Sequence, residues 1–193
     1  SLIMQDAVLL TMMPHSLFEI NTGSGAIATI SASRTKGTYV YLADSSRVVC
    51  NGSFTVGAGQ QTEMILQKSG SLLIGPQGEF TVGASTFEIG PSSFWIINGV
   101  FFVDGSGTLR SELQSNITVS GSLESTNGGS IDLKAGTTTR IGSSGQLSLN
   151  GDLVLMPSSQ LDLEGKLTMY SASSLVLSSF SGFTLPASTS LIL

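Results

Sequence analysis

Four charged residues in the second half of the chain have a spacing that could place them side by side. Arg110 and Asp132 are 22 residues apart, and so are Glu112 and Lys134. Carboxylates beside basic side chains can act as general acids and bases, the chemistry that cleaves polysaccharides. These four residues therefore form a candidate carbohydrate site. The alternative interpretation is a surface salt-bridge ladder, in which each acid has its own base and each pair contributes about 0–1 kcal/mol.

The same spacing governs the apolar residues, which recur as pairs with one residue between them. In such a triplet the outer two side chains point to one side of a short strand and the middle one points to the other side. One family of triplets begins at Leu109, Ile131, Leu153 and Leu175, and a second begins at Trp95, Ile117, Thr139, Leu161 and Phe183. A third family begins at Phe101, Leu123, Leu147, Leu167 and Leu191, with steps of 20 to 24 residues.

Three strands per 22 residues predict one coil of a parallel β-helix. We expect an all-β fold, a right-handed parallel β-helix (β-solenoid) of about eight coils, each with three short strands and about 22 residues. Upstream the repeat lengthens, and residues 31–38 and 57–62 are predicted to form loops at a corner. An antiparallel sandwich also alternates strands with Gly- and Ser-rich turns, but it has no reason to keep one period over five cycles.

The predicted solenoid forms a single domain over residues 1–193. Its terminal strands carry apolar residues, among them "LIL" at positions 191–193, where solenoids usually have a polar cap. We therefore expect the chain to be a segment of a longer protein, and self-association through uncapped ends is the alternative.

The predicted register also directs several apolar side chains outward, where contiguous apolar residues typically mark interfaces. These candidate interface residues are Ile65, Leu73, Ile96, Phe102, Val154 and Val176. A slip of one residue around "FWII" (94–97) is the alternative, and it would place Phe94 and Ile96 inside the coil.

The composition excludes several classes of protein. The net charge is −5 with only eight Lys and Arg, so no basic stripe exists for nucleic acid. The longest apolar run, residues 7–13, is too short to cross a bilayer, so we expect no membrane insertion. One cysteine permits no internal disulfide.

Neither a catalytic residue set, nor a metal site, nor a cofactor site is predicted. Cys50 is expected to be a buried free thiol, and His15, the only histidine, is expected to lie in a turn. Two Asn-x-Ser/Thr sequons, at Asn51 and Asn116 in predicted corners, are possible glycosylation sites. An outward column with several Thr residues also raises the weaker alternative of an ice-binding solenoid: Thr55, Thr81, Phe102, Glu124, Ser148 and Thr168.

The phrases "SGQLSLNGDLVL" (144–155) and "SSQLDLEGKLTM" (158–169) resemble right-handed parallel β-helix surface proteins. The nearest likeness is to the passengers of autotransporters and of filamentous-haemagglutinin-type adhesins, within the wider pectin-lyase-like superfamily. This resemblance implies a secreted, elongated and non-catalytic protein that acts as a stalk or adhesin. That superfamily also includes enzymes and tailspikes, but no catalytic set of theirs transfers to these positions.

Two functional hypotheses follow. In the first, the chain is a non-catalytic structural or adhesive module, extracellular or on a cell, virion or filament surface, whose partners are proteins, its own copies or glycans. In the second, it is a carbohydrate-binding or carbohydrate-cleaving β-helix (lyase-, hydrolase- or tailspike-like) that uses the Arg110, Glu112, Asp132 and Lys134 site.

Overall fold

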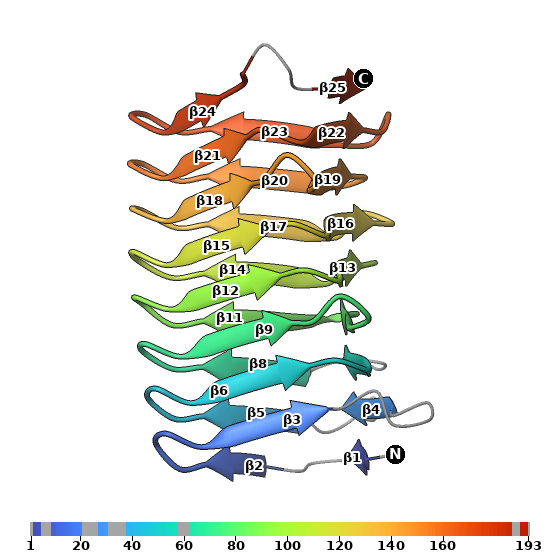
Figure 1. The fold of residues 1–193 in the computed structure, drawn as a ribbon, viewed down its shortest axis with the longest axis vertical. Coiled ribbons are helices and arrows are strands. Elements are labelled where there is room, and N and C mark those ends of the chain that lie inside the picture. Colours follow the sequence, from blue (N-terminus) through green and yellow to red (C-terminus); the bar gives the residue numbers. More distant parts are fainter. Residues whose placement is uncertain are drawn as a thin grey trace.

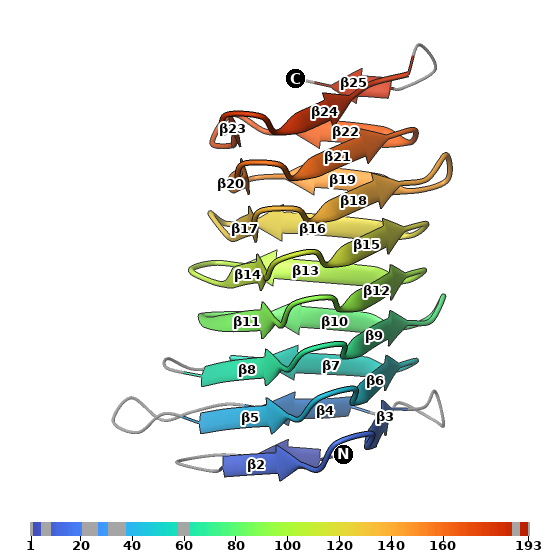
Figure 2. The same ribbon diagram turned by 90° about the vertical axis from the view of Figure 1, so that its left-hand side faces the viewer.

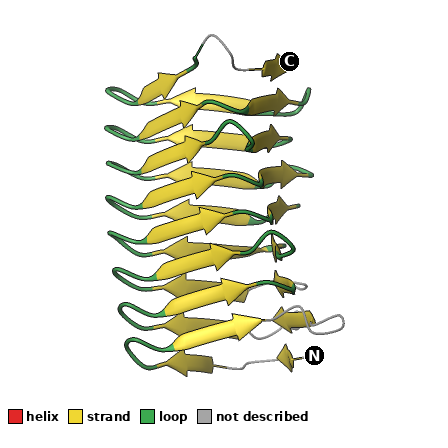
Figure 3. Ribbon diagram, in the orientation of Figure 1, coloured by secondary structure: helices red, strands yellow, loops and turns green. Residues whose placement is uncertain are grey.

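The fold is a stack of short strands in three parallel sheets (Figures 1 and 3), seen in a computed structural model of the chain. The structure describes residues 2–4, 9–20, 27–30, 38–57, 62–186 and 190–192. Most of the two predicted corner loops, residues 31–37 and 58–61, lies outside the described residues, and so does Leu193.

Every third strand along the chain belongs to the same sheet. Sheet A contains β1 (Leu2–Met4), β4 (Ile27–Ile30), β7 (Ser53–Val56), β10 (Glu79–Val82), β13 (Val100–Asp104), β16 (Ser122–Thr126), β19 (Gln146–Leu149), β22 (Lys166–Met169) and β25 (Ser190–Ile192). Sheet B contains β2 (Leu9–Met12), β5 (Thr38–Leu42), β8 (Thr62–Leu66), β11 (Ser85–Ile89), β14 (Thr108–Ser111), β17 (Ser130–Leu133), β20 (Asp152–Leu155) and β23 (Ser174–Leu177). Sheet C contains β3 (Leu17–Ile20), β6 (Arg47–Cys50), β9 (Ser71–Ile74), β12 (Phe94–Ile97), β15 (Asn116–Val119), β18 (Thr138–Ile141), β21 (Gln160–Leu163) and β24 (Gly182–Thr184).

The chain winds as a right-handed solenoid. In Figure 1 the strands of sheet C lie nearest the viewer and run left to right while the chain rises from the N- to the C-terminus, and Figure 2 shows the chain passing from sheet B to sheet C in the same sense. The predicted register is confirmed: Leu109 pairs with Ile131, and Ile131 pairs with Leu153, all in parallel ladders. Parallel pairing throughout the described strands excludes the antiparallel sandwich.

The fold class and the repeat of about 22 residues are as predicted, but the predicted number of coils is slightly high. The regular solenoid has roughly six turns, within the uninterrupted segment 62–186. The remaining strands belong to parts of the chain that are interrupted by residues outside the described ranges.

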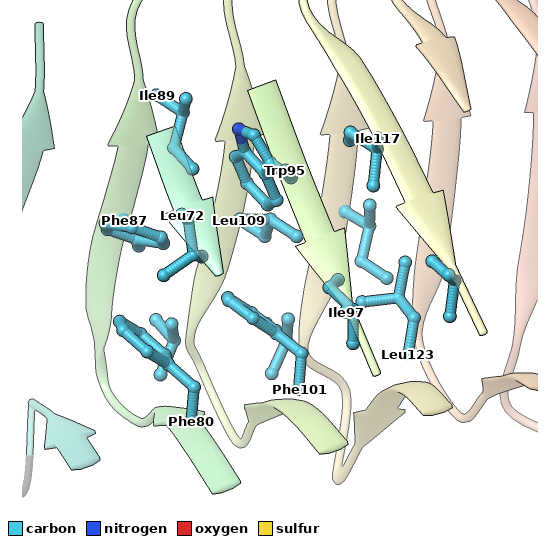
Figure 4. Close-up of a cluster of buried hydrophobic side chains, with 14 of the residues drawn as sticks. Leu72, Phe80, Phe87, Ile89, Trp95, Ile97, Phe101, Leu109, Ile117 and Leu123 are labelled. Atoms are coloured by element: carbon cyan, nitrogen blue, oxygen red, sulfur yellow. The ribbon is translucent and has the colours of Figure 1, made fainter. Parts of the chain in front are cut away.

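The core fills the inside of the coils with one apolar layer per turn. Alternate strand residues are almost fully buried, because each coil covers the inward side chains of the one before it. Phe80 stacks on Phe101 of the next coil with ring centroids 5.0 Å apart, and it contacts Phe54 of the preceding coil edge-to-face with ring centroids 4.9 Å apart. Trp95 lies beside this column at 6.0 Å from Phe101, inside the cluster shown in Figure 4. In β12, Trp95 and Ile97 are buried while Phe94 and Ile96 point outward, so the alternative register is wrong.

The corner between sheets B and C is held by a column of hydroxyl groups. A residue with positive φ, such as Ser92 or Gln114, reverses the chain there, and the next residue is a Ser or Thr in most coils, whereas Gly70 follows Ser69. The hydroxyl of Ser115 donates to the carbonyl of Glu112 at 2.7 Å and also lies 3.2 Å from the Gly90 carbonyl of the coil below. The same position is occupied in other coils by Ser46, Ser93, Thr137, Ser159 and Ser181. These bonds satisfy carbonyls that the sheet ladders leave unpaired at the bend.

Candidate functional site

The predicted carbohydrate site lies on the outer face of sheet B, where the ladders bring three charged side chains into one row. Arg110 is aligned with Glu88 on one side and with Asp132 on the other. Its guanidinium lies 3.9 Å from the Glu88 carboxylate and 3.8 Å from the Asp132 carboxylate. We call Glu88, Arg110 and Asp132 the charge row. The row has the arrangement of the salt-bridge ladder, one cation shared between two acids.

The carboxyl group of Glu88 has a perturbed acidity. Partial burial on the sheet surface raises the pKa of Glu88, and the negative charge of Glu112 raises it further, while Arg110 acts in the opposite direction. A carboxyl whose pKa is raised holds its proton more readily, which is a property of general acids. Chemically, the charge row could therefore donate a proton from Glu88 and bind an anionic group through Arg110.

The other two predicted residues lie at the rim of the same face. Glu112 directly follows β14 and Lys134 directly follows β17, so they occupy equivalent corner positions in successive coils, and both are half-buried. The structure thus brings all four predicted residues to one side of the solenoid. Glu88 joins them, because it is aligned with Arg110 in the same ladder.

On sheet C, a second pair of opposite charges is aligned in the ladder without forming an ion pair. Arg140 is aligned with Asp162 across β18 and β21. The guanidinium of Arg140, however, contacts Glu164 at 2.6 Å, and the Asp162 carboxylate accepts a hydrogen bond from the Gln160 side chain. The long arginine side chain reaches past its aligned neighbour to the corner, which strand register alone does not reveal.

The six apolar residues predicted to point outward do so, but they do not form one surface. Ile65, Val154 and Val176 belong to sheet B, Leu73 and Ile96 to sheet C, and Phe102 to sheet A. Leu73 and Ile96 are aligned neighbours in their ladder, and Val154 and Val176 are aligned neighbours in theirs. The candidate interface residues therefore divide among three faces.

The outer face of sheet C carries two exposed large apolar side chains on one strand. Phe94 is 55% exposed and Ile96 is 39% exposed, and both belong to β12. Beside them, a cavity of about 180 Å³ is lined by Arg47, Ser71, Leu72, Leu73, Phe94 and Ile96. Phe94 was not among the predicted interface residues, although the register that directs Ile96 outward directs Phe94 outward as well. We call Leu73, Phe94 and Ile96 the apolar patch.

The two sequons have different surroundings. Asn116 is exposed, but it is the first residue of β15 and does not lie in a corner as predicted. Asn51 is half-buried in the bend between β6 and β7. The outer face of sheet C therefore presents Asn116 to solvent, aligned with Phe94 in the ladder. Glycosylation of either residue stays a prediction.

Cys50 and His15 have the surroundings that the sequence predicts. Burial raises the pKa of the Cys50 thiol to about 11, and its sulfur contacts the backbone carbonyl of Gly52 at 3.2 Å. A buried neutral thiol is a poor nucleophile. His15 is an exposed turn residue with a φ of 61°.

Within the described ranges, no group of three or more His, Cys, Asp or Glu side chains is placed to hold a metal ion. The same residues contain no helix that is long and apolar enough to cross a membrane.

No family model matches the chain, and no curated protein sequence matches it. Among solved structures, the chain is similar to the crystal structure of a TibA fragment hyper-glycosylated by TibC. That match has 12% sequence identity, covers 98% of this chain and 99% of that chain, and has a TM-score of 0.14. A likeness at this TM-score carries no structural argument, so the function must be argued from the surfaces described above.

Proposed function

We propose that the chain is a non-catalytic structural or adhesive module of a secreted or cell-surface protein, or of a virion or filament. In this proposal it is a member of the β-helical surface proteins that its sequence resembles. The observation that carries the proposal is the unbroken register of the three sheets over residues 62–186. In-register stacking on one continuous core makes a stiff rod, and a stiff rod suits a protein that spaces or presents binding surfaces.

Two features of the side chains favour a role without catalysis. The only thiol is buried and keeps its proton, and the only histidine lies in an exposed turn. Arg110 lies between the two acids of the charge row, and one cation shared between two acids is the arrangement of a surface salt-bridge ladder. Exposed apolar side chains on the outer face of a sheet, by contrast, are typical of surfaces that bind another protein.

Binding assays on intact cells, together with negative-stain microscopy, test this proposal. A labelled sample of the purified chain should adhere to surfaces of its own source organism or of that organism's host, and its particles should be rods. The control is an unrelated β-solenoid of similar length, because a peptide of scrambled sequence would not have the same fold. Turnover of a polysaccharide by the wild-type chain that is lost on changing the charge row would contradict the proposal.

The second candidate is a carbohydrate-binding or carbohydrate-cleaving β-helix, and the raised pKa of Glu88 beside Arg110 favours it. Glu88→Gln, Glu112→Ala and Asp132→Ala should each abolish binding or cleavage of an acidic polysaccharide if this candidate holds. Because all three side chains lie on the outer face or at the corner, the core should remain folded. If activity on a polysaccharide panel is unchanged in all three variants, this second candidate is rejected.

A further inference from the structure

The outer face of sheet C has a self-complementary arrangement of side chains. One outward residue from each of six successive strands forms a single aligned column. In chain order the column is Glu19, Val49, Leu73, Ile96, Thr118 and Arg140. The column therefore begins with an exposed acid, ends with an exposed base, and has its apolar residues in the middle. Reversed end to end, such a column opposes Glu19 to Arg140 and Leu73 to Ile96, while Val49, which is only 7% exposed, falls opposite Thr118.

We propose that this face binds a second copy of the same chain, with the two solenoids antiparallel and related by a two-fold axis. The axis lies along the strand direction, between the levels of β9 and β12. This inference deepens the proposed structural or adhesive role, on which it rests, by naming the partner of the apolar patch. In Figure 1 this sheet is turned toward the viewer, and no described element crosses in front of it.

The two-fold axis opposes residues of the central strands in pairs. Leu73 of one copy faces Ile96 of the other, because β9 and β12 are at equal distances from the axis. In the neighbouring outward column, Ser71 aligns with Phe94, so Phe94 of one copy faces Ser71 of the other. Contacts are reciprocal in such an isologous interface, and each pair therefore occurs twice.

The cavity on this face provides the space for the aromatic ring. Ser71, a small residue, lines the cavity of about 180 Å³ together with Leu73 and Ile96. Phe94, which is 55% exposed, is the ring that the axis brings above Ser71. An aromatic side chain that enters an apolar pocket of its partner is a frequent centre of binding energy in protein interfaces.

Charge complementarity selects a second copy over an unrelated partner. The axis places Glu19 of each copy opposite Arg140 of the other, at the two ends of the interface. Arg140 also contacts Glu164 of its own chain, but its side chain remains 59% exposed, and a guanidinium has five N–H donors for more than one acceptor. In the neighbouring column, Arg47 faces Asn116 of the other copy, which offers an amide oxygen. No like charges are opposed in either column.

Sedimentation velocity over a range of protein concentrations tests the aromatic contact. The wild type should show a reversible monomer–dimer equilibrium. Phe94→Ser should weaken dimerisation by roughly tenfold or more, as expected for a central aromatic contact. Phe102→Ser is the matched control, because Phe102 is an outward phenylalanine on sheet A, and its dimer should be unchanged. Far-UV circular dichroism should show both variants folded, since both side chains lie outside the core.

A charge exchange tests the antiparallel geometry. Glu19→Arg alone opposes two arginines, Arg140→Glu alone opposes two glutamates, and each single variant should dimerise roughly tenfold more weakly. Mixing the two variants should restore a dimer that contains one copy of each, because both charge pairs are then attractive. Failure of the mixture to dimerise would overturn the antiparallel arrangement.

Two further results would overturn the inference. One is a wild type that is monomeric at every concentration, and the other is a dimer that Phe94→Ser and Phe102→Ser leave equally intact. These results are distinguishable from failure of the proposed function. A monomer that still adheres to cells removes only the dimer, whereas polysaccharide turnover that depends on the charge row removes the structural or adhesive role.

Discussion

Phe80 is the residue whose truncation should cost the solenoid most. Its ring is fully buried and lies 4.9 Å from Phe54, 5.0 Å from Phe101 and 5.0 Å from Phe87, so it contacts the coil below, the coil above and a neighbouring sheet. A buried Phe→Ala change typically costs about 3–5 kcal/mol, and each aromatic pair adds about 0.5–1.5 kcal/mol beyond burial. With three pairs lost, we expect Phe80→Ala to reduce the free energy of unfolding by about 5 kcal/mol, and Phe80→Leu by less.

Equilibrium unfolding in urea measures this loss, and Trp95, the single tryptophan of the chain, reports on the same layer of the core by its fluorescence. Thr81→Ala is the matched control, because Thr81 is the next residue along β10 and points outward. Its free energy of unfolding should change by no more than about 0.5 kcal/mol. A loss below about 2 kcal/mol in Phe80→Ala, or equal losses in the two variants, would refute the view that the aromatic column holds successive coils together.

Three further outcomes are expected. Ser115→Ala should lower the free energy of unfolding by about 1–2 kcal/mol in urea titrations, because two carbonyls lose a hydroxyl donor, whereas Ser106→Ala in an exposed turn should change it little; equal effects would contradict a structural hydroxyl column. The Cys50 thiol, with a pKa raised to about 11, should react with a disulfide reagent at pH 8 only after unfolding. Because its folded pKa exceeds the unfolded value of 9.0, the stability it contributes should be lost as pH rises from about 9 to 11, and a flat stability curve over that range would count against this. In Arg110→Ala the pKa of Glu88, followed by NMR, should rise above its already raised wild-type value, and an unchanged titration would show that Arg110 does not act on it.

The fold could be predicted because each coil repeats its apolar positions at a near-constant interval. Leu109, Ile131 and Leu153 recur every 22 residues, and in the structure they are aligned and buried. A stacked coil requires such a period, since every inward side chain needs a partner directly above it. Where the repeat lengthens to 30 residues near the N-terminus, the ladder still aligns Leu10 with Val40. The predicted coil number is slightly high, because it includes the irregular coils near the N-terminus.

The surface contacts could be predicted only in part. Strand register determines which Cα atoms are aligned, but it does not determine where the charged end of a long side chain lies. Arg140 begins beside Asp162 yet contacts Glu164, since its flexible side chain has several carboxylates within reach. The hydroxyl column at the sheet B–C corner was missed for another reason. Its members recur every 22 residues, as in Ser93 and Ser115, but they lie in turns, outside the apolar triplets that define the strands. The period of the hydroxyl residues in the turns is the signal in the sequence that indicates the column.

The three sheets of the solenoid have separate outer faces, so self-association and glycan binding are proposed for different surfaces. The charge row lies on sheet B and the apolar patch on sheet C, so pairing of two copies through sheet C leaves Arg110 and Asp132 open to solvent. The charge row and the apolar patch consist of outward side chains on different sheets, and distant independent sites usually have additive effects. Phe94→Ser should therefore change self-association without changing any glycan binding, and Asp132→Ala should do the reverse. If a substitution on one face changed both self-association and glycan binding, the two faces would be energetically coupled. That result would contradict the independence of the two surfaces.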